Sequence, residues 1–316
     1  MIEELLARGH RVVGGVRKTS EFDNLKLLDV ELRVMELTDP ESLSEATRGV
    51  ESIVHLAAYY TFHGKKEMYQ QVNVGGTRLL LEAAFRNSVR RFIYCSSTEA
   101  IGAVRNPPGD ETSSPNPEYD YGKSKLKAEQ IVREYGSKGM SWTIIRPSGI
   151  YGPRNVNDVS FWTITSFAKG DLLTKFVVGS GNNLIQFAHV KDVIQGFVLA
   201  LENEDVAKNQ VYIISEGRSY TYNELYKMLA GICGRAPPKV HVPAIIAKLM
   251  IAPVEALNRI TLRENFMWHV STVNSVSTDR FYSVEKAKHE LHFSPRYDLK
   301  TGLTETVAWY RANGFL

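Results

Sequence analysis

The segment 91–97 constrains the fold most strongly, because it is a short apolar run that stops in two hydroxyl side chains, Ser96 and Ser97. A second run, residues 142–147, stops in a similar way before Ser148. Buried strands that end in small polar residues are typical of an open α/β sheet, whose ligands bind outside the carboxyl ends of the strands. The two segments therefore predict strands of such a sheet, with a ligand site where they end.

Tyr121 and Lys125 add a second constraint, because they stand four residues apart at the start of a segment that predicts a helix, residues 121–132. Residues at i and i+4 share one helical face, so the phenol and the ammonium can reach toward a common point. A nearby cation favours the phenolate, and we therefore expect Lys125 to lower the pKa of Tyr121 from its ordinary value of about 10. Such a tyrosine can exchange a proton with a substrate hydroxyl. The pair alone is weak evidence, since most such pairs are two surface residues.

Several short motifs follow one another along nearly the whole chain: His55-Leu56-Ala57-Ala58, Asn73-Val74-Gly75-Gly76-Thr77, Ser96-Ser97, Tyr121 to Lys125, and Arg146-Pro147 with Gly152-Pro153. In this order they resemble the extended short-chain dehydrogenase/reductase superfamily. The resemblance implies an α/β fold, namely a Rossmann-type doubly wound parallel sheet with a smaller C-terminal substrate lobe. It assigns residues 1–152 and 186–216 to the NAD(P)-binding domain, and residues 153–185 and 217–316 to the lobe.

The resemblance also implies roles for single residues. Ser97 would orient the substrate oxygen, Tyr121 would donate or accept the proton, and Lys125 would assist Tyr121. Tyr121 and Lys125 would also contact the nicotinamide ribose, near which Asn73 would order the strand ends. The remaining positions that match cofactor contacts of the family are Asp39, which would lie against the adenine ring, and Leu56, Ala57, Ala58 and Pro147.

In the family, the residue at the end of the second strand usually determines the preference between the two nicotinamide cofactors. Here that position carries Val16, followed by Arg17 and Lys18. An Asp at this place would accept hydrogen bonds from the ribose, whereas an Arg pairs with a 2′-phosphate. Arg17 therefore favours NADP(H), with NAD(H) still possible. The alternative is that Arg17 and Lys18 only open a solvated loop.

The family's glycine-rich turn, G-x-x-G-x-x-G, is the largest departure from the pattern. Gly149 and Gly152 have the first spacing, but Asn155 occupies the third place, and no such triplet occurs in the 316 residues. The chain opens in a predicted helix that ends at Gly9. In the family, a strand and this glycine-rich turn precede that helix. We expect the sequence to be N-terminally incomplete; the alternative is a protein that has lost full cofactor binding.

Two helix starts are predicted from capping-box spacing, in which a Ser or Thr precedes Glu by three residues. Thr38 and Glu41 form one such pair, and Thr221 and Glu224 form the other. A further helix is predicted over residues 161–168.

Composition excludes some classes of function. The formal charge of +3 is too small to argue for a nucleic-acid partner. Two cysteines cannot form a disulfide framework, no secretory signal is visible, and no metal-binding cluster is predicted. The most apolar later stretch, residues 243–257, is too short and too broken by Lys248 and Pro253 to span a bilayer. We expect a cytoplasmic protein, and the resemblance implies a homodimer that acts on a small-molecule substrate.

The branch of the family is predicted from the positions that face the substrate. Ser148 and Gly149 replace the Asn that nucleotide-sugar enzymes use for a diphosphate, and residues 182–186 lack their Arg. The segment 96–100 is similar to that of 3β-hydroxysteroid dehydrogenases, although Glu99 could match the acid of sugar dehydratases or be structural. Residues 240–273 are rich in large apolar side chains, most of which we expect in the core and some in an apolar pocket.

These features predict an NAD(P)-dependent oxidoreductase of a secondary alcohol or ketone in a hydrophobic substrate, in the style of 3β-hydroxysteroid dehydrogenase or dihydroflavonol reductase. The alternatives are a nucleotide-sugar epimerase or dehydratase, and a non-catalytic relic that lost cofactor binding.

Overall fold

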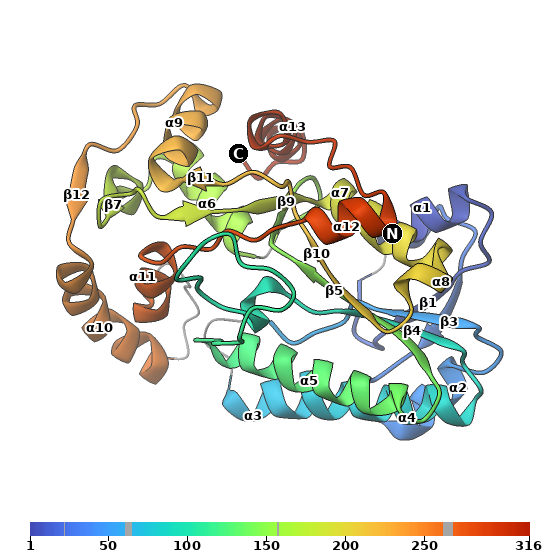
Figure 1. Cartoon of the computed structure of the whole chain (residues 1–316). Helices are drawn as coiled ribbons and strands as arrows, with labels where there is room; N and C mark the ends of the chain where they lie inside the picture. Colours follow the sequence, from blue (N-terminus) through green and yellow to red (C-terminus); the bar gives the residue numbers. More distant parts are fainter. Residues whose placement is uncertain (22, 61–64, 157, 262–267) are drawn as a thin grey trace.

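A parallel sheet with helices on both faces organises the computed structural model, which describes residues 1–21, 23–60, 65–156, 158–261 and 268–316 (Figure 1). Its four hydrogen-bonded strands run in the order β10 (Gln210–Ile214), β5 (Ser141–Pro147), β4 (Arg91–Cys95) and β3 (Ser52–His55). A separate parallel pair consists of β1 (Val13–Val16) and β2 (Glu31–Val34). The predicted α/β class with a Rossmann-type parallel sheet is confirmed.

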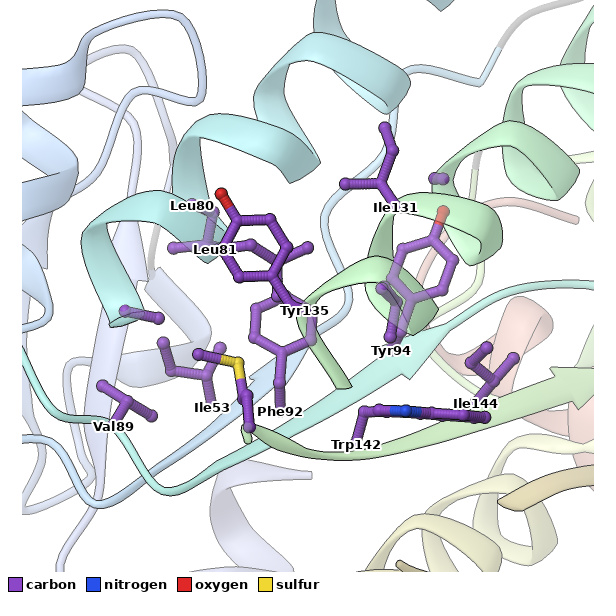
Figure 2. Packing of buried hydrophobic residues seen from close by; sticks show 14 of the residues in the cluster. Ile53, Leu80, Leu81, Val89, Phe92, Tyr94, Ile131, Tyr135, Trp142 and Ile144 are labelled. Carbon is purple, nitrogen blue, oxygen red and sulfur yellow. The ribbon is translucent and has the colours of Figure 1, made fainter. Parts of the chain in front are cut away.

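Successive residues of β4 point to opposite faces of the sheet, as the pleat requires. Phe92 and Tyr94 enter the hydrophobic cluster of Figure 2, together with Leu80 and Ile131 from two helices. Ile93 enters the cluster on the other face. Burial on both faces explains why the strands read as continuous apolar runs.

Helices cover both faces of the sheet and connect its strands. The helices on the face that carries Phe92 and Tyr94 are α2 (Pro40–Ala46), α4 (Thr77–Arg86) and α5 (Asp120–Gly136). The chain enters α4 through α3 (Lys66–Met68) and a π-helical turn, η2 (Tyr69–Gly76). Those on the opposite face are α7 (Val190–Glu202), α8 (Glu204–Ala207) and α12 (Glu285–Leu291). The chain begins in α1 (Ile2–Ala7), which ends before Gly9 at φ +81° as predicted.

A second cluster of helices and short strands lies beyond the carboxyl ends of the main strands. Its helices are α6 (Val159–Lys169), α9 (Tyr222–Cys233), α10 (Ala244–Thr261), α11 (Val270–Val276) and α13 (Leu299–Ala312). Its strand pairs are β6 (Gly149–Tyr151) with β9 (Phe187–His189), β7 (Phe176–Val178) with β12 (Val240–Val242), and β8 (Leu184–Ile185) with β11 (Tyr220–Thr221). Single 3-10 turns complete the described secondary structure at η1 (Asp23–Leu25), η3 (Thr98–Ala100) and η4 (Leu172–Lys175).

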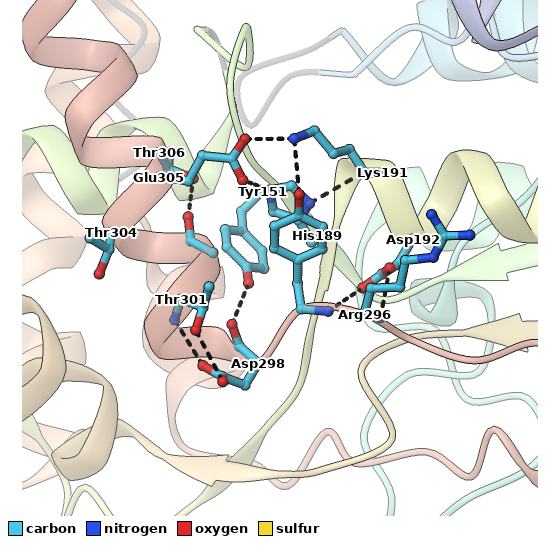
Figure 3. Close-up of polar contacts among 12 residues, drawn as sticks. Tyr151, His189, Lys191, Asp192, Arg296, Asp298, Thr301, Thr304, Glu305 and Thr306 are labelled. Atoms are coloured by element: carbon cyan, nitrogen blue, oxygen red, sulfur yellow. Dashed lines mark hydrogen bonds and ion pairs between the residues drawn. The ribbon is translucent and has the colours of Figure 1, made fainter. Parts of the chain in front are cut away.

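The polar contacts of Figure 3 join the start of α7 to the C-terminal segment. The ring of His189 stacks on that of Tyr297 with centroids 3.8 Å apart. Lys191 Nζ donates to Tyr297 Oη at 2.9 Å and to Glu305 Oε1 at 2.7 Å. Asp192 accepts a hydrogen bond from the backbone N–H of Tyr297 at 3.2 Å. These contacts hold α13 and the segment before it against the start of α7.

The predicted helix caps are right at one place and wrong at another. Thr221 and Glu224 form the complete capping box of α9. At α2, however, the cap is Asp39 rather than Thr38, and its Oδ1 accepts from the N–H of Glu41 at 3.0 Å. Pro40 explains the difference, because its φ suits the first helical position and makes the residue before it the cap.

The expectation that residues 240–273 are mostly core is wrong for α10. Ile245, Leu249 and Met250 are 68%, 71% and 66% exposed. The helix packs mainly against α11 at one end of the molecule, so only one of its sides is covered (Figure 1). No helix in the described ranges is both long enough and apolar enough to cross a membrane.

Gly302 allows α13 to pack closely against β6, and it gives a test of this packing. A Cβ at Gly302 would lie 2.7 Å from Cζ of Tyr151, whose side chain is 1% exposed and cannot move aside. We expect Gly302→Ala to lower the free energy of unfolding by about 1–3 kcal/mol. The matched control is Gly231→Ala in α9, where a Cβ meets nothing within 4 Å and helix propensity should add about 0.5–1 kcal/mol. Urea unfolding measures both, and equal effects would contradict the packing.

Candidate active site

A cavity of about 850 Å³ opens where the parallel strands end. Cys95, Ser96 and Ser97 line it at the end of β4, and Pro147 and Ser148 line it at the end of β5. Tyr121 faces it from the first turn of α5. The remaining walls come from the second cluster of helices, including Asp158, Phe187, Tyr222, Tyr226 and His269. The cavity is therefore at the edge of the sheet that the strand endings predicted.

Ser97 and Tyr121 share this cavity, and Lys125 lies beside them. Ser97 Oγ accepts from the N–H of Glu99 at 3.1 Å and so caps η3, which leaves its hydroxyl proton able to donate to a ligand. Lys125 is 1% exposed. Its Nζ donates to the carbonyl of Cys95 at 2.7 Å and stands 5.7 Å from the ring centroid of Tyr121. The structure thus brings the three residues together.

The pKa of Tyr121 moves in the direction opposite to the one expected. Burial raises it, and nearby acidic groups, among them Glu99 and Asp158, raise it further. Burial also lowers the pKa of Lys125. The expectation that Lys125 lowers the pKa of Tyr121 is therefore wrong for the protein as described. The reason is geometric, since Nζ is bound to a backbone carbonyl and faces the ring. The phenol keeps its proton at neutral pH.

A buried ion pair joins the elements that carry these residues. Glu129 of α5 is 0% exposed and accepts from Arg146 of β5 through both oxygens, at 2.8 Å and 2.7 Å. Ser96, the residue before Ser97, donates to the same carboxylate at 2.6 Å. One carboxylate therefore holds α5 and the ends of β4 and β5 in fixed positions.

A second buried arginine, Arg280, stands in the cavity wall. It is 7% exposed, donates to both oxygens of Glu99 at 2.8 and 3.0 Å, and donates to Glu118 at 2.8 Å. Its guanidinium lies 5.6 Å from the ring centroid of Tyr119. Burial raises the pKa of Glu99, against the opposing charge of Arg280. Sequence reasoning left Glu99 open and missed Glu118 and Arg280, because no motif connects positions so far apart.

Asn73 lies in the π-helical turn before α4 and is fully engaged. Its amide accepts from the N–H of Tyr59 at 2.6 Å, donates to the carbonyl of Tyr59 at 2.9 Å, and donates to Ser124 Oγ at 2.9 Å. It therefore ties the loop after β3 to α5, three residues from Tyr121.

The other predicted cofactor contacts are dispersed. Pro147 lines the cavity, whereas Arg17 is exposed just after β1 and Asp39 caps α2. Leu56, Ala57 and Ala58 are exposed where β3 ends. These residues lie outside the cavity lining but at the same carboxyl side of the strands.

The groups present fit one end of a nicotinamide dinucleotide. A phenol and a serine hydroxyl line the cavity, the ammonium of Lys125 lies behind the phenol, and together they suit a nicotinamide ribose and a reacting oxygen. The chain contains no G-x-x-G-x-x-G turn, so its own residues do not supply the glycine cradle of the pyrophosphate. Among the described side chains, no group of three or more His, Cys, Asp or Glu residues is arranged to hold a metal ion.

The ion pair predicts a large effect for a small change. Glu129→Gln removes the charge and leaves Arg146 buried without its partner, which should cost about 3–5 kcal/mol of unfolding free energy. The control, Glu134→Gln on the same helix, changes an exposed carboxylate that lies 3.3 Å from Arg78 and should cost under about 1 kcal/mol. Thermal and urea unfolding compare the two. Equal stabilities would show that the pair is not structural.

Comparisons with known proteins agree with this geometry. Residues 1–215 match the model of the NAD dependent epimerase/dehydratase family. The chain is 28% identical to the sterol demethylase protein B of Methylococcus capsulatus, over 100% of this chain and 95% of that protein. It is 29% identical to a 3 beta-hydroxysteroid dehydrogenase/Delta 5-->4-isomerase of Mycobacterium tuberculosis, over 98% and 86%. The solved structure described as gox2253 is 31% identical with a TM-score of 0.84, over 100% of this chain and 94% of that chain. The chain belongs to the NAD dependent epimerase/dehydratase family, and with it to the extended short-chain dehydrogenase/reductase enzymes.

Proposed function

We propose that this enzyme oxidises a secondary alcohol, or reduces the matching ketone, in a hydrophobic and uncharged substrate. The observation that carries the proposal is that Ser97 and Tyr121 line one cavity, with the buried ammonium of Lys125 5.7 Å from the ring centroid of Tyr121. A nicotinamide cofactor, when bound, supplies the hydride chemistry. The names of the sterol demethylase and hydroxysteroid dehydrogenase relatives support a substrate of this class.

The chain's own residues would move the proton and hold the oxygen. Ser97 donates its hydroxyl proton to the carbonyl oxygen of the substrate, while its Oγ is held by the N–H of Glu99. Tyr121, which burial keeps protonated, gives its proton to the oxygen as negative charge develops there. Lys125, whose ammonium the carbonyl of Cys95 holds 5.7 Å from the ring centroid of Tyr121, would hold the nicotinamide ribose. In the oxidation direction the same proton returns to Tyr121.

The cavity wall supports an uncharged substrate over a nucleoside diphosphate. Phe187, Tyr222 and Tyr226 give the wall apolar surface. Arg280 is already bound by two carboxylates, so it offers no spare positive charge to a diphosphate. A volume of about 850 Å³ suits a small molecule of several rings. Nucleotide-sugar epimerisation is the second candidate, which the family match favours.

Several finer properties belong to the same proposal. We propose that residues 1–152 and 186–216 form the NAD(P)-binding domain and residues 153–185 and 217–316 the substrate lobe, supported by the cavity residues Asp158, Tyr222 and His269 of the lobe. A cytoplasmic location and a homodimer through the outer sides of α4 and α5 rest on the resemblance. NADP(H) is preferred over NAD(H), and the exposed guanidinium of Arg17 after β1 supports this preference.

Tyr121→Phe tests the catalytic assignment, because it removes one hydroxyl and keeps the ring. We expect kcat to fall by about 10²–10⁴-fold, measured by NADPH absorbance with a ketosteroid and, separately, by chromatography of the products with UDP-sugars, whose epimerisation consumes no net NADPH. The control is Tyr135→Phe, which removes a hydroxyl from the same helix in the hydrophobic cluster. Near-normal turnover of Tyr121→Phe would overturn the assignment. Failure of the wild-type chain to bind NADPH in a fluorescence titration would favour a non-catalytic relic.

Arg17→Ala tests the cofactor preference. Loss of the pairing with the 2′-phosphate should raise the Kd for NADPH about tenfold, which equals about 1.4 kcal/mol, and leave the Kd for NADH unchanged. Arg48→Ala, another exposed arginine, is the control. Equal Kd values for the two cofactors in the wild-type chain would contradict the preference.

A further inference from the structure

We propose that the outer face of α10 docks on a lipid bilayer that carries anionic headgroups, next to the substrate cavity. α10 is a helix of 18 residues, Ala244–Thr261, at one end of the molecule (Figure 1). The proposal concerns a surface and does not depend on the reaction proposed above.

The outer face of α10 is a continuous apolar stripe. Its members are large aliphatic or thioether side chains that are 47–79% exposed: Ile245, Ile246, Leu249, Met250, Leu257 and Ile260. At about 100° per residue they fall within about 140° of the helix circumference. The buried residues of the helix, Ala247 and Glu255, lie on the other side. The apolar side therefore faces away from the protein, which is the reverse of a helix that packs on a core.

The charges around the stripe suit an anionic surface. Lys239 is exposed five residues before the helix and Lys248 is half-buried within it. The single acid between residues 235 and 261, Glu255, is 9% exposed. Its Oε2 accepts from the N–H of Val270 at 2.8 Å, so this carboxylate points toward α11. A helix with an apolar stripe, basic flanks and no exposed acid binds in the interface of a membrane with acidic lipids.

A second copy of the chain suits the stripe less well. A twofold symmetric dimer would bring two copies of the same patch together, and so it would place the lysines of both copies at one interface with no exposed acid of α10 to pair them. A bilayer instead brings opposite charge. α10 also contains Pro253 and falls short of what crossing a membrane requires, so the contact lies on the surface and does not span it.

The inner side of the same helix faces the cavity. Glu255 of α10 lines the cavity together with His269, Ser271 and Thr272 at the start of α11. The apolar stripe and the cavity wall are thus the two sides of one helix. An apolar ligand dissolved in the bilayer would meet the protein at the helix that bounds its cavity.

Sedimentation of the full chain with vesicles tests the proposal. The vesicles contain phosphatidylcholine alone or phosphatidylcholine with phosphatidylserine. We expect binding to the mixed vesicles that falls with added salt, since exposed charges are screened. Leu249→Glu places a carboxylate in the stripe and should weaken the binding about tenfold or more. Lys248→Glu should remove the preference for phosphatidylserine.

The matched control is Leu27→Glu, because Leu27 is 97% exposed and lies next to β2, outside the stripe. It should bind vesicles as the wild-type chain does. Circular dichroism checks that each variant is folded. We expect folded variants, because a substitution at an exposed position removes few packing contacts. Absence of vesicle binding by the wild-type chain, or equal binding by Leu249→Glu, would overturn the proposal. The proposal would also be overturned if the wild-type chain were a dimer, Leu249→Glu were a monomer, and neither protein bound vesicles.

Discussion

The carboxylate of Glu129 is the interaction on which the site depends. It lies on α5 two turns after Tyr121, and it binds Arg146 of β5 and Ser96 at the end of β4. Two charges in a dry interior are stable only when each is paired and hydrogen-bonded, so their partners have little freedom to move. The helix that carries the phenol and ammonium and the strand ends that carry the serine are therefore held as one unit. The Glu129–Arg146 ion pair therefore helps to fix the relative positions of Ser97, Tyr121 and Lys125.

Much of the fold could be predicted from local patterns, and the reasons are physical. Apolar runs such as residues 91–95 can be buried on both faces only in a sheet with helices on each side, which is the sheet observed. Ser97, Tyr121 and Lys125 follow from their spacing and from the family resemblance, and they do meet. The apolar composition of α10, by contrast, gave the wrong expectation, because composition does not say whether a partner covers a helix.

Properties that depend on three-dimensional surroundings were beyond the sequence. The i and i+4 spacing placed Lys125 near Tyr121, but the spacing could not reveal that Nζ binds Cys95 and that burial dominates the pKa of the phenol. Glu99, Glu118 and Arg280 come from two loops separated by more than half the chain. Their contact depends on how the C-terminal segment returns to the strand ends. Together they give the cavity wall a polar region whose charges are paired.

The π-helical turn Tyr69–Gly76 has a consequence for the evolution of this site. A π turn holds one more residue than an α turn in the same length of axis. Deleting a single residue there would give a regular helix, in which the side chains of the turn itself point in different directions relative to α4. Asn73 would then leave Tyr59 and Ser124, and the loop after β3 would lose its tether to α5. Length in this short segment is therefore under tighter constraint than residue identity at its exposed positions.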